Sequence, residues 1–370
     1  MRLDNMKQFE LPDQGTDSPS KKKIPYPISP KLRKYLQRFG REMPMGLQYE
    51  DLTRFTFAIP ILDTNAKDTQ WERVSYDLRE WAYISDGLVK MYAILKTEGD
   101  LSFANHLEVA QVEFCGFGNS QPFRVRIVNK YNANYDHFYV KRADASRIYG
   151  LELEHVLSPH RLNYFTSGQT LIEEHIPGIP GDFFIKDILP AMPNPLRFYK
   201  EFVKFNERCF VRLLGDMRSY NYVVEMPPDI DGVQYRIRAI DFDQQSYEGR
   251  KNLYLPQFFV ENTPIVKKIV EHFNQESVAQ YQAEERARIV FRIITERYQV
   301  KELLDAMVHD KLAPKEKIDQ LKVQLADHYK ETKFLRAKTM GQIVKLQLKQ
   351  NLMASLMTVQ NARQFRGARI

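Results

Sequence analysis

The sequence predicts an α+β fold, in which a strand-rich N-terminal part is followed by a helical C-terminal part and a further helical extension. Residues 107–142 contain short runs of alternating apolar and polar side chains, a pattern typical of half-buried strands. Residues 213–245 contain two strand-like runs joined by the turn sequence Pro-Pro-Asp-Ile-Asp-Gly. From residue 263 onward, apolar residues recur with the 3.6-residue period of a helix.

The composition is that of a globular protein. The chain has 370 residues, 43% of them hydrophobic, which is enough for more than one domain. Cys115 and Cys209 are its two cysteines, too few for a disulfide framework or a cysteine-rich zinc site, so we expect a cytoplasmic protein. No run approaches the roughly 20 apolar residues of a membrane span, and the N-terminus lacks the apolar stretch of a secretory signal. We therefore expect no transmembrane segment.

The positive charge is concentrated at the C-terminus. The formal net charge is +7, and residues 311–370 hold 13 Lys and Arg against 4 Asp and Glu, which is +9. The remaining 310 residues therefore carry −2. A basic helix of this kind is usually a solvated face, but it could also contact an acidic partner, a nucleic acid or a membrane surface.

Five segments are expected along the chain. Residues 1–45 are polar and proline-rich, and predict a flexible arm that becomes ordered around the sequence Lys-Leu-Arg-Lys-Tyr-Leu. Residues 46–106 mix strand and helix signals and form an N-terminal extension with no assignable chemistry. Residues 107–176 hold the strands, residues 177–310 are mainly helical, and residues 311–370 form the basic helical tail.

The strands of residues 107–142 have a clear expected orientation. Phe123, Val125 and Ile127 should face one side of a sheet, because alternate residues of a strand point to the same side. Gly116 and Gly118 mark a turn before that strand, and the run "HFYVKR" predicts a further strand. A helix is expected after it, in "DASRIYGLELEHVL".

The run from 213 to 245 carries the chemistry. Asp216 follows a helical segment, Asn221 comes five residues later at the start of a strand, and Asp241 ends the returning strand. Because a hairpin sets its strands side by side, Asn221 and Asp241 should converge. Carboxylate and amide oxygens are ligands that suit Mg²⁺.

This arrangement of Asp216, Asn221 and Asp241 resembles the catalytic-loop and metal-binding pair of the protein kinase-like superfamily. The resemblance covers roughly residues 107–260 and is greatest to bacterial small-molecule kinases of the aminoglycoside and choline kinase type. It implies a two-lobed fold with a strand-rich N-lobe and a helical C-lobe, and the use of ATP and Mg²⁺. It also implies that Asp216 orients or deprotonates an acceptor hydroxyl, while Asn221 and Asp241 hold the metal.

The resemblance extends to residues that would bind the nucleotide. Lys141 is similar to the lysine that anchors the phosphates, and Glu154, or in second place Glu152, is similar to its glutamate partner. The loop "GFGNSQ" resembles a glycine-rich nucleotide loop, and "LIEEHIPG" resembles an interlobe hinge whose backbone faces adenine. The positions implied there are Gly116 and Gly118 in the loop, and Glu174, His175 and Ile176 in the hinge.

Plainer interpretations stand beside these. Asp216 and Asn221 are also residue types that cap helices and form turns, and a Lys such as Lys141 is common at strand edges. Glu154 could lie on a solvated helix face, and the two glycines could belong to a simple hairpin turn. Asp243 replaces the glycine usual after Asp-Phe, and is either a third metal carboxylate or a structural cap. Four arginines could add positive charge near the site: Arg212, Arg218, Arg236 and Arg238.

Three classes of function remain open from the sequence. The first is an ATP- and Mg²⁺-dependent phosphotransferase acting on a hydroxyl group, of a small molecule or of another acceptor, or a relative that transfers the nucleotide itself. The second is a pseudokinase, an interaction module whose basic tail recruits a partner; the third glycine missing at Gln121 favours it. The third is a nucleic-acid binder that uses the tail, which lacks closely spaced aromatic residues.

Overall fold

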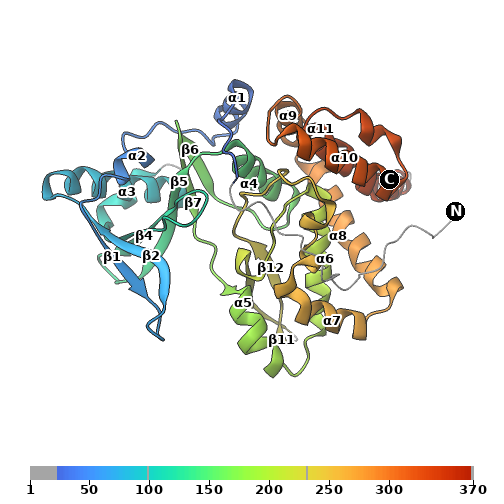
Figure 1. Cartoon of the computed structure of the whole chain (residues 1–370), viewed down its shortest axis with the longest axis horizontal. Helices are drawn as coiled ribbons and strands as arrows, with labels where there is room; N and C mark the ends of the chain where they lie inside the picture. Colours follow the sequence, from blue (N-terminus) through green and yellow to red (C-terminus); the bar gives the residue numbers. More distant parts are fainter. Residues whose placement is uncertain (1–22, 98–99, 231, 368–370) are drawn as a thin grey trace. The chain divides into compact units, whose positions relative to one another are not determined.

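The chain forms two compact units in this computed structural model (Figure 1). The structure describes residues 23–97, 100–230 and 232–367. Unit 2 comprises Pro27–Ala145 and Leu162–His175, and unit 1 comprises the residues up to Tyr26, Ser146–Arg161 and the residues from Ile176 onward. Unit 2 holds the large sheet and unit 1 most of the helices, so the predicted α+β class, with strands first and helices after, is confirmed.

Unit 2 is built on a seven-stranded antiparallel sheet with the order β1-β2-β3-β4-β5-β7-β6. Its strands are β1 (Phe57–Leu62), β2 (Asp68–Ser75), β3 (Leu107–Phe114), β4 (Phe123–Asn129), β5 (Tyr135–Arg142), β6 (Tyr164–Ser167) and β7 (Thr170–Glu174). Its helices are α1 (Pro30–Arg38), α2 (Tyr49–Leu52), α3 (Leu78–Thr97) and the short η1 (Leu101–His106).

One face of this sheet is apolar and the other is polar. Phe123, Val125 and Ile127 are buried together, as the alternation predicted, and α3 packs against β3, β4 and β7. On β5, Phe138 and Val140 join the same core, so alternate residues of that strand point to the opposite face. The polar face of the sheet is therefore the face that carries Lys141.

From Pro27 onward, the N-terminal part of the chain belongs to unit 2. Helix α1 begins at Pro30 after Ser29, whose side chain accepts a hydrogen bond from the Leu32 backbone N–H. Residues 1–22 of the predicted flexible arm lie outside the described residues. Residues 46–106, predicted as a separate extension, contribute β1, β2 and α3 to the sheet and its core.

Unit 1 is mainly helical. Its helices are α4 (Ala145–Leu157), α5 (Gly181–Phe183), α6 (Leu196–Arg212), α7 (Thr263–His272), α8 (Gln275–Thr295), α9 (Arg297–Met307), α10 (Lys315–Tyr329) and α11 (Met340–Gly367). Shorter turns are η2 (Phe184–Ile188), η3 (Leu189–Ala191), η4 (Ser219–Asn221), η5 (Lys251–Tyr254), η6 (Pro256–Phe258), η7 (Val260–Asn262) and η8 (Thr332–Arg336). A three-stranded sheet has the order β12-β9-β8, and β10 pairs with β11. These strands are β8 (Ile179–Pro180), β9 (Tyr222–Glu225), β10 (Pro228–Asp229), β11 (Gly232–Val233) and β12 (Arg236–Ala239).

Helix α4 belongs to unit 1, whereas the sequence predicted that it belongs to the strand-rich part formed by residues 107–176. Its Ser146 hydroxyl donates to the Gln245 backbone oxygen, and its Tyr149 hydroxyl donates to Asp310 at 2.7 Å. An added Cβ at Gly150 would lie 2.9 Å from the Cβ of Phe242, so the helix packs directly on the segment that follows β12. The compact units therefore divide the chain on both sides of α4.

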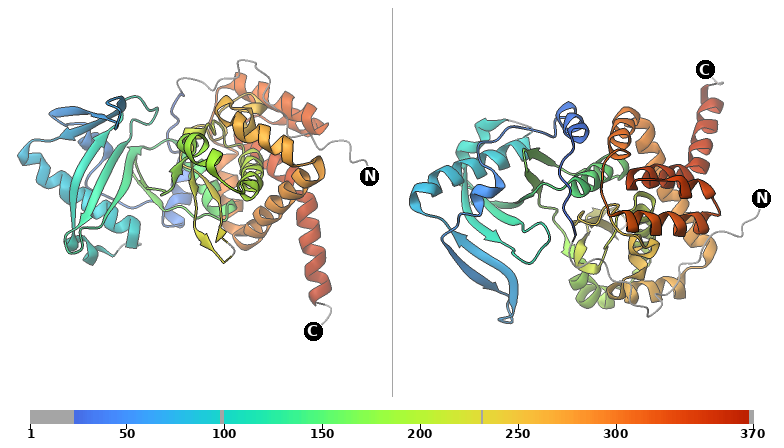
Figure 2. Two further views of the ribbon diagram at one scale, coloured as in Figure 1. Left: turned by 90° about the horizontal axis from the view of Figure 1, so that it is seen from below. Right: turned by 45° about the horizontal axis from the view of Figure 1, so that its top comes forward.

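The basic C-terminal segment, predicted as a helical tail, contributes α10 and α11 to the core of unit 1. Leu321 and Leu325 of α10 and Ile343 and Val344 of α11 are fully buried. The last turns of α11 project away from the other helices of the unit (Figure 2). Among the residues that the structure describes, no helix has both the length and the apolarity of a membrane span.

Candidate functional site

The predicted hairpin of unit 1 is formed by β9 and β12. The strands are antiparallel, with Ala239 opposite Tyr222 and Arg236 opposite Glu225. Asn221 directly precedes β9 and Asp241 lies two residues after β12, so both lie at the same end of the hairpin. The Ile240 backbone N–H donates to the Asn221 backbone oxygen at 3.0 Å, which extends the pairing to that end.

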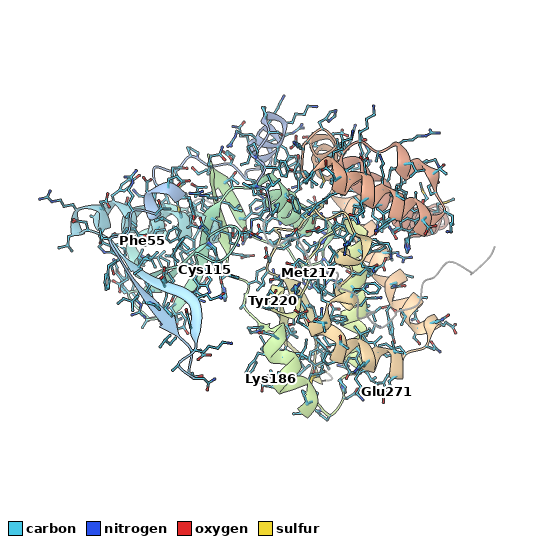
Figure 3. All side chains as sticks on the ribbon, in the orientation of Figure 1. Phe55, Cys115, Lys186, Met217, Tyr220 and Glu271 are labelled. Atoms are coloured by element: carbon cyan, nitrogen blue, oxygen red, sulfur yellow. The ribbon has the colours of Figure 1, made fainter. Side chains whose placement is uncertain are left out.

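Asp216 and Asn221 are joined in the loop between α6 and β9, which is marked in Figure 3 by Met217 and Tyr220. The Asn221 Nδ2 donates to the Asp216 backbone oxygen at 2.7 Å. That bond fixes the amide nitrogen on the side of the loop backbone and turns the amide oxygen to the other side. The Asp216 backbone has a φ of +58°, a left-handed conformation that Asp adopts more readily than most residues.

The Asp216 carboxyl lies in an unfavourable place for a negative charge. Burial, followed by the charge of Asp241 and to a smaller extent that of Glu248, raises its pKa to about 7. Arg218 opposes these effects, because its Nε donates to the Asp216 Oδ1 at 3.1 Å. A carboxyl whose pKa lies near neutral pH is suited to accept a proton from a hydroxyl.

Helix α4 supplies a buried arginine to the end of the hairpin that carries Asp241. The Arg147 Nη2 lies 3.3 Å from the Asp241 Oδ1 and 2.5 Å from the Asp243 Oδ1, and its Nε donates to Asp243 at 2.8 Å. Asp243 is buried, whereas 36% of the Asp241 side chain is exposed. Of the two roles open for Asp243, the structural one fits this ion pair, and Asp241 is the carboxylate that remains accessible.

The residues at this end of the hairpin fit a metal that is bound together with a nucleotide. Asp216 and Asp241 supply carboxylates, and Asn221 supplies an amide oxygen. Among the described residues, no group of three or more His, Cys, Asp or Glu side chains could hold a metal. Mg²⁺ rarely needs such a cage, because it usually takes one or two carboxylates together with phosphate oxygens and water. The donor set thus suits a Mg²⁺–nucleotide complex better than a metal held by protein alone.

Lys141 of unit 2 is a buried lysine on the polar face of the sheet. Its Nζ lies 2.6 Å from the Glu173 Oε2, and both side chains are less than 10% exposed. The Tyr139 ring lies 5.3 Å from the same Nζ. Glu173 was not singled out from the sequence. The pairing register of β5 and β7 would have indicated this residue. Leu171 is opposite Lys141, so Glu173, two residues further on, lies diagonally across from Lys141 on the same face of the sheet.

The expected pair of Lys141 and Glu154 stays a prediction, since the two residues belong to different units. Within unit 1, Glu154 forms a buried ion pair with Arg212. Glu152, the second choice, is buried and accepts a hydrogen bond from the Gln299 Nε2 at 3.3 Å. Glu154 is therefore not on a solvated face, and it connects α4 to α6.

The glycines of the β3–β4 connection are not required by the backbone there. Neither Gly116 nor Gly118 has a positive φ, and an added Cβ at either would make only ordinary contacts at 3.4 Å. The Cys115 backbone N–H donates to the Pro122 oxygen at 3.0 Å and closes the turn. This geometry is that of a hairpin connection, and a nucleotide-covering role for the two glycines stays a prediction.

The expected hinge lies where the chain passes from unit 2 to unit 1, between His175 and Ile176. The Glu174 backbone N–H donates to the Asn163 oxygen at 3.0 Å, so this amide is already used within unit 2 and does not face a ligand. The His175 Nδ1 lies 3.3 Å from the Tyr139 hydroxyl, and burial lowers the pKa of His175. Backbone contacts from His175 and Ile176 to adenine remain predictions.

The four arginines expected near the site have different roles. Arg218 contacts Asp216 and donates to the Glu261 Oε1 at 2.7 Å. Arg212 is buried against Glu154. Of the two arginines of β12, Arg238 pairs with Glu225 at 2.8 Å and Arg236 donates to Gln234. Arg218 is thus the member of this set that contacts Asp216, while Arg147, which the sequence did not suggest, contacts Asp241.

Comparisons with known proteins find only a remote similarity. No protein-family model matches the chain, and no curated protein matches it significantly. A search of solved structures finds the crystal structure of the Rio2 kinase–ADP/Mg²⁺–phosphoaspartate complex from Chaetomium thermophilum. The identity is 12% and the TM-score is 0.32, over 68% of this chain and 80% of that chain.

Proposed function

We propose that the chain is an ATP- and Mg²⁺-dependent phosphotransferase of protein kinase-like fold that acts on a hydroxyl group. The observation that carries the proposal is the convergence of Asp216, Asn221 and Asp241 at one end of the hairpin. Phosphoryl transfer needs positioning and charge neutralisation more than covalent help from the protein, and these residue types supply both.

Each residue has a distinct task in this proposal. Asn221 and Asp241 would hold Mg²⁺, which when bound neutralises charge on the transferred phosphoryl group. Asp216 would accept the proton of the acceptor hydroxyl, because its pKa of about 7 lets it take and release a proton near neutral pH. Arg218, hydrogen-bonded to Asp216, would add positive charge beside the acceptor. Lys141 would bind the α- and β-phosphates, with Glu173 orienting its ammonium group.

A small-molecule acceptor is favoured by the segment that follows Asp241. In protein kinases regulated by phosphorylation, the corresponding loop becomes ordered when it is modified. Here Gln245, Ser246 and Tyr247 are all buried, and Ser246 is fully inaccessible. A phosphorylation switch in this segment is therefore not expected, and we propose an enzyme that acts on soluble hydroxyl compounds.

The direct test uses γ-labelled ATP with Mg²⁺. Transfer of the labelled phosphate to water is measured first, as formation of ADP. Transfer to a panel of amino alcohols, sugars and aminoglycosides is measured next. We expect activity in the wild type and its loss in Asp216→Asn and Asp241→Asn. Asp229→Asn, an exposed carboxyl at the tip of the same hairpin, serves as the matched control and should retain activity.

Mg-ATP binding separates the proposal from a pseudokinase. We expect Mg-ATP to raise the melting temperature of the wild type and of Asp216→Asn, but to have little effect on Asp241→Asn, which lacks a metal ligand. No transfer to any acceptor, together with a melting temperature indifferent to Mg-ATP, would overturn the proposal. The mass gained by an acceptor distinguishes phosphoryl transfer from transfer of the nucleotide.

A further inference from the structure

The segment of residues 244–254, called here the 244–254 segment, lies just beyond Asp241 and Asp243 and is largely buried. Its first five residues are all buried: Gln244, Gln245, Ser246, Tyr247 and Glu248. The Tyr254 hydroxyl donates to the Glu248 backbone oxygen at 2.6 Å, which closes the segment on itself. A buried polar stretch of this kind needs partners for its backbone groups, and the partners are found on two sides.

On one side, the 244–254 segment holds the backbone of the loop that carries Asp216. The Gly215 N–H donates to the Gln244 oxygen at 3.2 Å, and the Asp216 N–H donates to the Leu253 oxygen at 3.1 Å. In the reverse direction, the Ser246 N–H donates to the Leu213 oxygen at 2.9 Å. The 244–254 segment is thus hydrogen-bonded to the backbone of the loop from Leu213 to Asp216.

This pairing coincides with unusual backbone conformations. Leu213, Asp216 and Ser246 have φ values of +57°, +58° and +52°. A left-handed conformation in a residue other than glycine costs free energy and persists only where the surrounding structure imposes it. Leu213 is the left-handed C-terminal cap of α6, with its N–H bonded back to that helix. The Asp216 N–H is instead bonded to the Leu253 oxygen, so the 244–254 segment contributes to fixing the Asp216 backbone and with it the direction of the Asp216 side chain.

On its other side, the 244–254 segment is held by α10. The Lys317 Nζ pairs with the Glu248 Oε2 at 2.8 Å and lies 3.8 Å from the centre of the Tyr247 ring. The Gln324 Oε1 accepts a hydrogen bond from the Lys251 backbone N–H at 2.7 Å. These two contacts are almost two helical turns apart, so they hold the segment at two points.

Gly249 shows how closely α10 approaches the segment between these contacts. An added Cβ at Gly249 would lie 2.4 Å from the Gln320 Oε1 and 3.0 Å from the Lys317 Cα. The Cα atom cannot move aside as a flexible side chain can, so the helix rests on the backbone of the segment. Contacts therefore run without interruption from α10 through the 244–254 segment to the backbone N–H of Asp216.

We propose that α10 is a positioning element for Asp216, acting through the 244–254 segment. In this view the first helix of the basic C-terminal extension completes the candidate site. Lys317 and Gln324 are its positioning residues, because each of them contacts the 244–254 segment. The consequence for activity rests on the proposed function, whereas the consequence for the conformation of the Asp216 loop does not.

Hydrogen exchange of the full-length protein tests the conformational part. The variant is Lys317→Met with Gln324→Leu, and the matched control is Lys322→Met, whose lysine pairs with Asp319 on the same helix. We expect exchange in peptides covering 213–218 and 244–254 to become roughly tenfold faster in the double variant, since two contacts are lost, and to stay within about twofold in the control. Lys317→Arg, which keeps the charge, should restore most of the protection when Gln324 is intact.

The 213–218 peptide decides the outcome. If exchange accelerates in 244–254 but not in 213–218, α10 holds the segment without positioning Asp216, and the proposal is overturned. If the double variant unfolds, as judged by circular dichroism, Gln324→Leu alone is measured, and the same direction is required of it.

ADP formation tests the consequence for activity. We expect kcat to fall about tenfold or more in the double variant while the KM for ATP changes less than about twofold, because a displaced Asp216 affects the transfer step and not nucleotide binding. An equal change in kcat and KM, or none in either, would contradict a positioning role. If the wild type forms no ADP, the proposed function fails, and the exchange experiment still decides whether α10 fixes the Asp216 loop.

Discussion

At the scale of single residues, the candidate site depends on the environment of Asp216. Burial of its carboxyl, followed by the negative charges of Asp241 and Glu248, raises the pKa of Asp216 from 3.8 to about 7, and Arg218 compensates only in part. Protonation of Asp216 is favoured in the folded protein, and its ionisation costs stability. Active sites commonly contain groups held in states that the fold itself disfavours.

This environment predicts a pH-dependent effect of Asp216→Asn on stability. Because the folded-state pKa lies above the unfolded value, the stabilising contribution of Asp216 is complete below about pH 4 and is lost as the pH rises through about 7. The asparagine variant does not ionise. Its free energy of unfolding, relative to the wild type, should therefore increase by about 2–4 kcal/mol between pH 4 and pH 8. Urea unfolding at the two pH values measures this, and a pH-independent difference would show that Asp216 titrates normally.

At the scale of elements, α4 and the hairpin together fix the end of the candidate site that carries Asp241. Helix α4 presents Arg147 to Asp241 and Asp243, and Glu154 to Arg212, so one face of the helix is fixed by buried ion pairs. Breaking a buried pair by removing one partner is far more costly than the pair's net contribution, because it leaves a charge unpaired. The orientation of α4 is therefore strongly determined relative to the hairpin within unit 1.

Gly150→Ala tests the packing of α4 on this segment. The new Cβ would lie 2.9 Å from the Phe242 Cβ and 3.1 Å from the Gln245 Cβ, so the helix or the segment has to shift. We expect a loss of about 1–3 kcal/mol in the free energy of unfolding, and weaker stabilisation by Mg-ATP because Asp241 adjoins Phe242. Gly46→Ala is the control, since nothing lies within 4 Å of its added Cβ, and it should be neutral or slightly stabilising. Equal melting temperatures for the two variants would contradict close packing of α4.

Elements with a regular pattern were predictable from the sequence, and pairings between distant segments were not. The alternation of Phe123, Val125 and Ile127 predicted the buried face of β4, and the turn after β9 predicted that Asn221 and Asp241 converge. Nothing local to Arg147 indicates Asp243, because that contact joins residues 96 positions apart. Local patterns report secondary structure and hairpins, whereas contacts across the chain depend on how the elements pack.

At the scale of the whole chain, the charge of the C-terminal extension suggested a separate tail, and its apolar residues show otherwise. Charge counts describe the exposed face of an amphipathic helix and say little of the opposite face. In α11, the Gln347 Nε2 donates to the Phe210 backbone oxygen of α6 at 3.1 Å, and an added Cβ at Gly341 would lie 2.1 Å from the Met307 oxygen of α9. The extension is therefore packed into unit 1 by direct contact with two of its helices.

Two substitutions on α10 separate a packed helix from an accessory tail. Leu321 is fully buried and Val323, two residues away, is 55% exposed. Leu321→Glu should reduce the free energy of unfolding of unit 1 by about 3 kcal/mol or more, because it buries an unpaired carboxylate among apolar neighbours. Val323→Glu adds the same charge to the exposed face and should change stability by less than about 0.5 kcal/mol. If the extension were a dispensable tail, both variants would melt at the wild-type temperature. If Leu321→Glu alone lost cooperative unfolding, α10 would belong to the folding unit that carries Asp216.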